Sequence, residues 1–248
     1  MRVHPAFTAL RALAFLVVLS TAACTSGDSA RLGDSADGPA EADAGDWITL
    51  FDGTSMDGWS GYLRDDVPEA WSVEDGAITF TPGRSGGDLM APGTYGDFEL
   101  ALEYRVGECG NSGVVYHIEE REALRDTWQS GLEMQVLDNS CHPDAQYPSH
   151  RAGALYDLYT PTADASRGAG EWNQALIRVE DGALTHTLNG QTVVTAQTGT
   201  DDWRARIAAS KFRDGAKFPG FGTRTSGAIA LQDHGDPVAF RDIRIRRL

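Results

Sequence analysis

Positive charge is scarce in this chain. It carries 21 Lys and Arg against 36 Asp and Glu, which gives a formal net charge of -15 at pH 7. A chain this acidic is repelled by polyphosphate and by anionic lipid headgroups, so nucleic acid is not an expected partner. The Walker phosphate loop, the dinucleotide-binding fingerprint and the Cys-x-x-Cys pair are missing as well, so phosphate and redox chemistry find no support.

Long hydrophobic runs are also missing. The apolar run Ala12–Leu19 falls well short of the ~20 residues that cross a bilayer core. Two arginines precede it and small residues follow it, so residues 1–23 are expected to be a signal peptide. The junction with Cys24 resembles a bacterial lipoprotein cleavage site, although Thr21 stands where such sites usually have Leu. We expect export with a lipid anchor at Cys24; ordinary cleavage, giving a periplasmic or secreted protein, is the alternative.

The stretch that follows has too few apolar side chains to fold. Residues 24–46 contain no aromatic residue and a single Leu among many Asp, Ser, Ala and Gly. Such a segment cannot bury enough surface to offset its ordering entropy, and we expect a flexible acidic tether. No second low-complexity linker follows, so residues 47–248 are predicted to form a single domain.

The excess of Ala, Glu, Lys and Leu that marks helical proteins is absent, whereas 28 Gly, 10 Pro, 6 Trp, 7 Tyr and 9 Phe suit an all-β domain. The pairs Asn189-Gly190 and Asp181-Gly182 are typical of hairpin turns. One short helix is predicted around Asp201–Lys211. Strands are predicted at 47–51, 71–74, 77–80, 98–106, 113–118, 131–137, 173–180, 183–188, 191–195, 228–232 and 239–246.

Strand alternation sorts side chains onto two faces. Glu133 and Gln135 lie opposite the apolar residues of their strand, and Gln232 and His234 lie opposite Ile229 and Leu231. A polar face on a single strand is ordinarily just solvated. Solvated faces, however, are more often built of Thr, Ser and Lys than of Glu, Gln and His. If these strands are neighbours, their polar faces converge into one concave site.

Eight short motifs then appear in the order seen in one known family. They are Leu50-Phe51-Asp52-Gly53 with Gly58-Trp59, Asn111-Ser112-Gly113-Val114, Glu133–Asp138, Gly153–Asp157, Gly170–Asn173, Leu188-Asn189-Gly190, Leu231–Gly235 and Phe240–Ile243. Together they cover the chain from Trp47 to its C-terminus, and the chain resembles the 3-keto-disaccharide hydrolase family. The resemblance implies a concanavalin A-like jelly-roll β-sandwich, and a secreted or lipoprotein enzyme acting on oxidised disaccharides.

The chemistry that this family implies needs few groups. A ketone at sugar carbon 3 acidifies the proton on carbon 2, so a base can remove that proton and the enolate can expel the glycosidic oxygen from carbon 1. Water then adds to the unsaturated sugar, and the net reaction is hydrolysis of a 3-keto-glycoside. Such a route requires one base, a donor or a metal near the ketone oxygen, and an acid for the leaving group.

The expected catalytic residues are Glu133, with His234 next in line. Asn111, Gln135 and Gln232 are expected to bind sugar hydroxyls or the ketone, and Tyr156 to stack on a sugar ring. Tyr156, like Trp128 and Tyr116, has a core position as its alternative. Arg105 is assigned to substrate binding; its alternatives are a surface ion pair with Glu103 and an internal ion pair with Glu133.

Other interpretations stay open. His142, Asp144 and His150 have the side chains to hold a divalent cation, although a polar loop is the simpler interpretation. A non-catalytic, lectin-like carbohydrate-binding module is the alternative function on the same fold. A glucanase mechanism needs a second carboxylate on the same strand face as Glu133. It is poorly supported, because Gln135 cannot ionise and Asp138 is expected on the opposite face of the strand.

Cysteine is scarce too, with three residues in the chain. Setting aside Cys24 at the signal junction leaves Cys109 and Cys141, and export implies an oxidising compartment. We therefore predict a Cys109–Cys141 disulfide; two separate buried thiols are the alternative.

Overall fold

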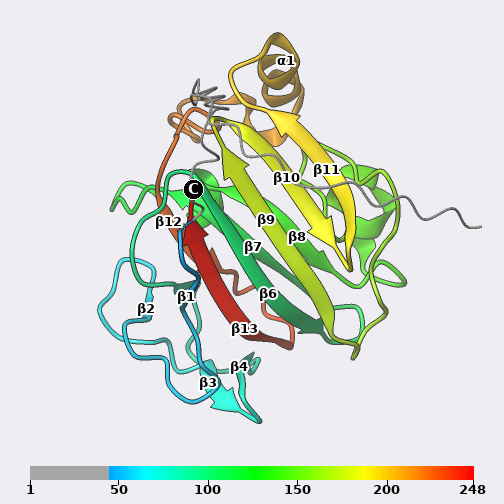
Figure 1. Cartoon of the computed structure of the whole chain (residues 1–248). Coiled ribbons are helices and arrows are strands. Elements are labelled where there is room, and N and C mark those ends of the chain that lie inside the picture. The colour runs from blue at the N-terminus through cyan, green and yellow to red at the C-terminus, as the bar shows by residue number, and fades with distance from the viewer. Residues whose placement is uncertain (1–44) are drawn as a thin grey trace, which may run out of the picture. The chain divides into compact units, whose positions relative to one another are not determined.

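The computed structural model describes residues 45–248, which form two antiparallel sheets packed face to face (Figure 1). The predicted all-β sandwich is confirmed. The signal peptide, Cys24 and the tether as far as residue 44 lie outside the described residues. Ordered structure begins slightly before Trp47, because the Gly45 amide donates to the carbonyl of Arg247 at 3.2 Å. Within residues 45–248, no helix has the length and apolar character to span a membrane.

The larger sheet has eight strands and the smaller one five. The larger runs in the order β11 (Gln191–Gln197), β10 (Ala183–Leu188), β9 (Asn173–Glu180), β6 (Phe98–Val106), β13 (Val238–Arg247), β4 (Ala77–Phe80) and β3 (Trp71–Glu74), with β1 (Ile48–Thr49) also paired to β13. The smaller runs in the order β2 (Ser60–Gly61), β5 (Leu89–Met90), β12 (Ala228–Leu231), β7 (Asn111–Ile118) and β8 (Leu132–Leu137).

Two hairpins follow directly from their turn residues. Asn189 and Gly190, with φ of 50° and 81°, join β10 to β11, and Asp181 and Gly182, with φ of 48° and 76°, join β9 to β10. Positive φ at both central residues gives the turn a twist that matches the strands, which is why Asn-Gly and Asp-Gly are favoured there. Both predicted hairpins are confirmed.

Helices occupy little of the domain. The predicted helix is α1 (Asp201–Ala209), and it begins where the Thr200 hydroxyl accepts a hydrogen bond from the Trp203 amide. This capping satisfies one of the free N–H groups at a helix start. Four short 3-10 helices complete the set in the described residues: η1 (Thr127–Gln129), η2 (Pro143–Gln146), η3 (Pro148–His150) and η4 (Lys211–Arg213).

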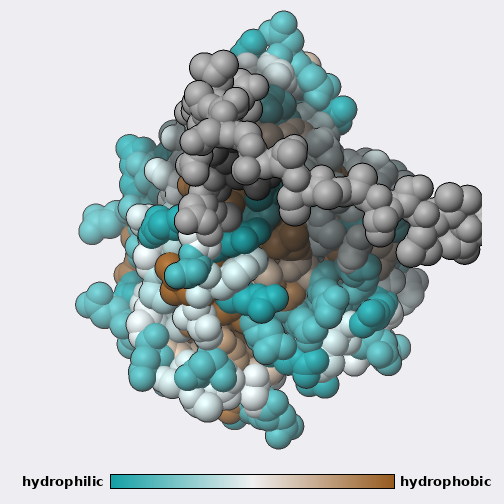
Figure 2. Space-filling view, viewed as in Figure 1, coloured by the Kyte–Doolittle hydropathy of each residue, from teal (hydrophilic) through white to brown (hydrophobic). Residues whose placement is uncertain are grey.

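The core lies between the sheets and follows the predicted alternation. Leu132, Met134 and Val136 of β8 point into it, as do the apolar residues of β6. Tyr116 is fully buried there, with its hydroxyl 3.0 Å from His186 Nε2, so it belongs to the core. On the face shown in Figure 2, hydrophobic residues appear as limited areas among hydrophilic ones.

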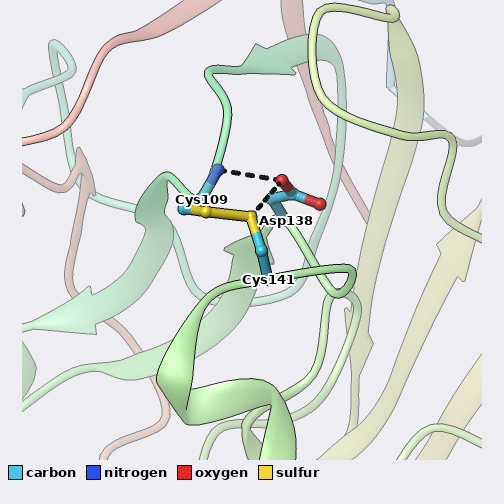
Figure 3. Close-up of side chains that lie close together, drawn as sticks. All are labelled: Cys109, Asp138 and Cys141. Carbon is cyan, nitrogen blue, oxygen red and sulfur yellow. Dashed lines mark hydrogen bonds between the residues drawn. A yellow bond between two sulfur atoms is a disulfide. The ribbon is translucent and has the colours of Figure 1, made fainter.

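A disulfide joins the loop before β7 to the loop after β8. Cys109 and Cys141 are bonded, with their Cα atoms 5.1 Å apart, as the sequence predicted (Figure 3). Asp138 lies beside the bond, and its Oδ2 accepts a hydrogen bond from the Cys109 amide at 2.9 Å. Asp138 thus supports this loop, in keeping with its parity opposite to Glu133.

Candidate active site

Polar side chains from three neighbouring strands meet on the outer face of the smaller sheet. β7 lies between β8 and β12, so the polar faces of residues 133–135 and 232–234 are brought together as predicted. The pocket between them has a volume of about 160 Å³. It is lined by Asn111, Trp128, Glu133, Gln135, Tyr156, Lys211, Gln232 and His234.

Glu133 is the one carboxylate among these lining residues, and it is 5% exposed. Burial raises the pKa of its carboxyl to about 7, and the nearby Asp88 and Asp144 add to this effect. Lys211 and the amide of Gln232 oppose it. A carboxyl with such a pKa is partly ionised near neutrality and can both take up and return a proton.

Two amides connect the floor of the pocket to His234. Gln135 Nε2 donates to Asn111 Oδ1 at 2.9 Å, and Asn111 Nδ2 lies 3.3 Å from His234 Nε2. Because the Asn111 oxygen already accepts from Gln135, its amide nitrogen faces the histidine and donates to Nε2. The remaining ring nitrogen, Nδ1, lies 3.9 Å from Asp236 Oδ2. Gln135 Oε1 is buried with no hydrogen-bond partner.

Two aromatic rings and a lysine form the opposite wall. Tyr156 reaches Glu133 because its amide donates to the Glu133 carbonyl at 3.0 Å, which holds this segment against β8. The Lys211 ammonium lies 4.3 Å from the ring centroid of Trp128 and 4.3 Å from that of Tyr156. Lys211 is exposed as a residue, but desolvation of its ammonium between the two rings lowers the pKa of this lysine, while Glu133, Asp157 and Asp144 act in the other direction.

Lys211 was missed by the sequence analysis, since it follows α1 in a segment with no strand parity to place it. Composition offered one signal. Lys211 and Lys217 are the two lysines of the chain, in which arginine supplies all other permanent positive charge. A lysine carries a compact charge and its pKa shifts more readily than that of an arginine. A lysine in a chain that otherwise uses arginine therefore marks position 211 as a candidate functional residue.

Arg105 is not brought to this pocket. It is exposed on β6, in the other sheet, and its guanidinium lies 4.8 Å from the ring centroid of Trp172. Neither of the alternative ion pairs of Arg105 forms. Glu103 pairs with Arg241, at 2.6 Å between Oε2 and Nη2, and Glu133 lies across the sandwich on the smaller sheet. Strand alternation correctly placed Arg105 on the face of β6 that points away from the core. However, β6 belongs to the larger sheet, so this face lies on the opposite side of the sandwich from the pocket.

The predicted cation set of His142, Asp144 and His150 is also corrected. His150 stacks on Tyr156 and places Nε2 3.2 Å from Asp157 Oδ1, with Asp144 on its other side at 3.7 Å. His142 instead turns its ring toward His234, with 6.2 Å between the ring centroids. Ligand atoms of His142, His234 and Asp236 lie within 4.8 Å of one another, beside the pocket.

A larger hollow, of about 930 Å³, lies on the outer face of the larger sheet. Its two glutamates are held in ion pairs, Glu99 with Arg178 and Arg246, and Glu103 with Arg241, whereas the exposed Asp52 at its edge accepts hydrogen bonds from its own turn. These partners lower the pKa of both carboxyls against the effect of burial. Carboxylates that are paired and fully ionised make poor acid–base groups, so size alone does not make this hollow the candidate site.

The site thus places an acid, a lysine and several amides on one sheet face of a jelly-roll sandwich. Residues 46–246 match the model of a family described as the 3-keto-alpha-glucoside-1,2-lyase-like domain. A 3-keto-disaccharide hydrolase from Bacteroides thetaiotaomicron is 36% identical over 241 residues, which cover 87% of this chain and 82% of that protein. The chain therefore belongs to the 3-keto-disaccharide hydrolase family.

Solved structures agree. The crystal structure of a candidate glycosyl hydrolase from Parabacteroides distasonis superimposes with a TM-score of 0.75 at 30% identity, covering 82% of this chain and 94% of that one. A Bacillus subtilis protein of unknown function with a galectin-like fold gives a TM-score of 0.54 at 11% identity, covering 81% and 94%, and shows the fold alone. The protein is a glycoside hydrolase with the predicted fold.

Proposed function

We propose that this enzyme cleaves the glycosidic bond of 3-keto-disaccharides by proton abstraction, elimination and water addition, with Glu133 as the base. The observation that carries the proposal is the buried Glu133 carboxyl, with a pKa raised to about 7, at the floor of the pocket. The pocket, at about 160 Å³, lies below the ~300–1,000 Å³ typical of drug-sized ligands. It therefore suits one sugar ring, with the second ring extending outside.

The steps balance without a covalent intermediate. Glu133 removes the proton from carbon 2, and the electron pair moves into an enolate whose charge rests on the oxygen at carbon 3. Collapse of the enolate breaks the bond from carbon 1 to the glycosidic oxygen, which takes up a proton as it leaves. Water then adds its oxygen to carbon 1 while carbon 2 regains a proton, so one water is consumed and the base is restored.

The lining residues distinguish this route from the alternatives. Retaining and inverting glycosidases ordinarily need two carboxyls at the scissile bond, whereas Glu133 is the one carboxylate lining this pocket. A lectin-like site needs ring platforms and amides, which Trp128, Asn111 and Gln232 provide, but gains nothing from a buried acid. His234, at the end of the amide chain, is proposed as the acid that protonates the leaving oxygen.

As an alternative to the acid role of His234, we also propose that His142, His234 and Asp236 can hold a divalent cation; a metal-bound His234 would have no proton to give to the leaving oxygen. Two imidazoles and a carboxylate suit a borderline metal. His142 Nδ1 now accepts a hydrogen bond from the Asp144 amide at 3.1 Å, which leaves the ring proton on Nε2. Cation binding through Nε2 therefore requires this tautomer to change. Titration of the apoprotein with Zn²⁺, Mn²⁺ or Co²⁺, beside an H142A variant, tests the proposal by calorimetry; equal binding to both proteins contradicts it.

The main experiment compares purified wild-type enzyme on 3-keto-trehalose and on ordinary trehalose. We expect cleavage of the keto sugar alone, because only that sugar has an acidic carbon 2 proton. Glu133→Gln keeps the shape of the side chain but loses the proton acceptor, so turnover should fall by about 10²–10⁴-fold while binding survives. Glu171→Gln, at an exposed position outside the pocket, is the matched control.

Two results would count against the proposal in different ways. A wild-type enzyme without activity on 3-keto-trehalose contradicts the substrate class. Near-normal turnover by Glu133→Gln would remove Glu133 from the role of base and pass it to His234.

A further inference from the structure

We propose that Lys211 is a further catalytic residue of this site: its ammonium, held over the rings of Trp128 and Tyr156, binds the ketone oxygen of the sugar and stabilises the enolate. The proposal rests on the function proposed above and assigns one of its unfilled roles. Enolate formation needs a positive charge or a strong donor where the negative charge develops.

The position of Lys211 is fixed from two sides. Its backbone amide, at the start of η4, donates to Asp157 Oδ2 at 2.7 Å. Its ammonium lies 4.3 Å from the ring centroids of both Trp128 and Tyr156, a distance typical of cation–π contacts. The two rings and the lysine line the same pocket as Glu133. The cation is thus carried to the wall of the pocket and held there.

The ammonium retains its hydrogen-bonding capacity. In residues 45–248, Lys211 Nζ takes part in none of the side-chain hydrogen bonds or salt bridges, in contrast to Lys217, which lies 3.9 Å from Asp214. An aromatic face attracts the charge but occupies no N–H in a conventional hydrogen bond. The donors of Lys211 are therefore available for an oxygen atom of a ligand in the pocket.

The surrounding charges favour a protonated Lys211 beside an ionised Glu133, which is the state that the reaction needs at its start. Glu133, Asp157 and Asp144 are the acidic groups whose charges act on Lys211, and they favour its charged form against burial. Lys211 in turn favours the ionised form of Glu133. The same charge thus supports the base before the reaction and the enolate after proton transfer, when the carboxyl has become neutral.

In the proposed step the lysine gives up no proton. Glu133 takes the proton from carbon 2, the electron pair forms the double bond between carbons 2 and 3, and the oxygen on carbon 3 becomes negative beside the ammonium. When the bond from carbon 1 to the glycosidic oxygen breaks, the electrons return and the ketone is restored. The leaving oxygen receives its proton from another group, for which His234 is proposed.

The test isolates enolate formation from bond cleavage. 1,5-Anhydro-3-keto-glucitol has no glycosidic oxygen at carbon 1, so its carbon 2 proton can exchange in D₂O without loss of a leaving sugar, and the exchange is followed by NMR. We expect Lys211→Met to slow the enzyme-catalysed exchange by about 10²–10³-fold, the usual effect of losing one donor to a developing oxyanion. Lys217→Met is the matched control and should exchange at the wild-type rate.

Several outcomes separate this proposal from the one on which it depends. A wild-type enzyme that neither exchanges nor cleaves overturns the proposed function. Wild-type exchange by a folded Lys211→Met protein that cleaves 3-keto-trehalose slowly overturns the present proposal, because Lys211 would then serve the leaving group. Lys211→Gln, which keeps a donor without the charge, is the second variant if Lys211→Met does not fold; exchange at the wild-type rate in Lys211→Gln also overturns it.

The pH dependence of the exchange rate distinguishes an electrostatic role of Lys211 from a purely structural one. Lys211 lowers the pKa of Glu133, while Asp88 and Asp144 raise it. Lys211→Met should therefore shift the acid limb of the exchange rate to higher pH, and Lys217→Met should leave it in place. An unshifted limb in Lys211→Met contradicts the placement of this charge beside the base.

Discussion

Glu133 sets the expected pH dependence of activity at the residue scale. The base must be ionised, and burial raises the pKa of its carboxyl to about 7. We therefore expect kcat/KM on a 3-keto-disaccharide to rise as pH increases through about 7. Desolvation of the Lys211 ammonium lowers its pKa. Because the proposed reaction needs this charge, the rate should fall on the alkaline side at a pH below the range of an ordinary lysine. A rate that is flat from pH 5 to 8 would contradict ionisation of Glu133 as the controlling event.

The same carboxyl should reduce the stability of the folded protein above neutral pH. Its pKa is about 7 in the folded state against 4.5 ordinarily, so the folded protein holds a proton that the unfolded chain releases between these pH values. The free energy of unfolding therefore falls as pH rises through this window, by up to roughly 3 kcal/mol by linkage. Glu133→Gln removes the ionisation and should be about 1–3 kcal/mol more stable than wild type at pH 8.

Denaturant unfolding at pH 4.5 and pH 8 measures this effect. The stability difference between Glu133→Gln and wild type should be small at pH 4.5, where the carboxyl is protonated in the folded state and about half protonated in the unfolded chain, and should grow toward pH 8. Glu171→Gln, altered at an exposed position, should show no such growth. A Glu133→Gln protein less stable than wild type at pH 8 would mean that its contact with Lys211 outweighs the cost of burial.

At the scale of single elements, strands β7 and β8 approach closely enough to make one glycine essential. A Cβ added to Gly113 would overlap Glu133 Oε1 and lie 2.9 Å from its Cδ. We expect Gly113→Ala to displace the carboxylate, to lower turnover by about 10²-fold, as a misplaced catalytic group does, and to lower stability by about 1–3 kcal/mol through overpacking.

Gly168→Ala is the control for this substitution, because a Cβ at Gly168 meets nothing within 4 Å. Turnover and unfolding of both variants are measured in parallel. Full activity in Gly113→Ala would show that Glu133 can be moved without consequence, which the role of base does not permit.

Alternation within strands was predictable, and pairing between strands was only partly so. The period of two placed Glu133 and Gln135 on one face and the apolar residues of β8 on the other, because one face of this strand is buried in the core. The same reasoning selected the correct face of β6 but not its sheet, so Arg105 was assigned to a pocket on the far side of the sandwich. Short strands such as β2 and β5, of two residues each, give no periodicity to detect.

At the scale of the whole molecule, the fold follows from composition and turn chemistry, whereas the site depends on contacts distant in sequence. Lys211 reaches the pocket because the segment after α1 binds Asp157. His142 meets His234 from a loop far along the chain. No local pattern encodes such meetings, so Lys211 was missed and His142 was grouped with the wrong partners. The Cys109–Cys141 bridge was predictable because few cysteines left few pairings.

Export of the whole protein is a prediction that rests on residues outside the described domain. We propose that residues 1–23 are removed and that Cys24 then carries a lipid, because a short apolar run ends in small residues directly before this cysteine. The acidic stretch from 25 to 46 would then hold the domain off a membrane that shares its negative charge. Mass spectrometry of the mature N-terminus from a bacterial host measures both events. We expect a diacylated Cys24 and, in Cys24→Ser, release of the domain into the soluble envelope fraction with its activity on 3-keto-disaccharides retained. An unmodified terminus at Ala23 or later contradicts lipidation but not export, whereas an intact Met1 contradicts both.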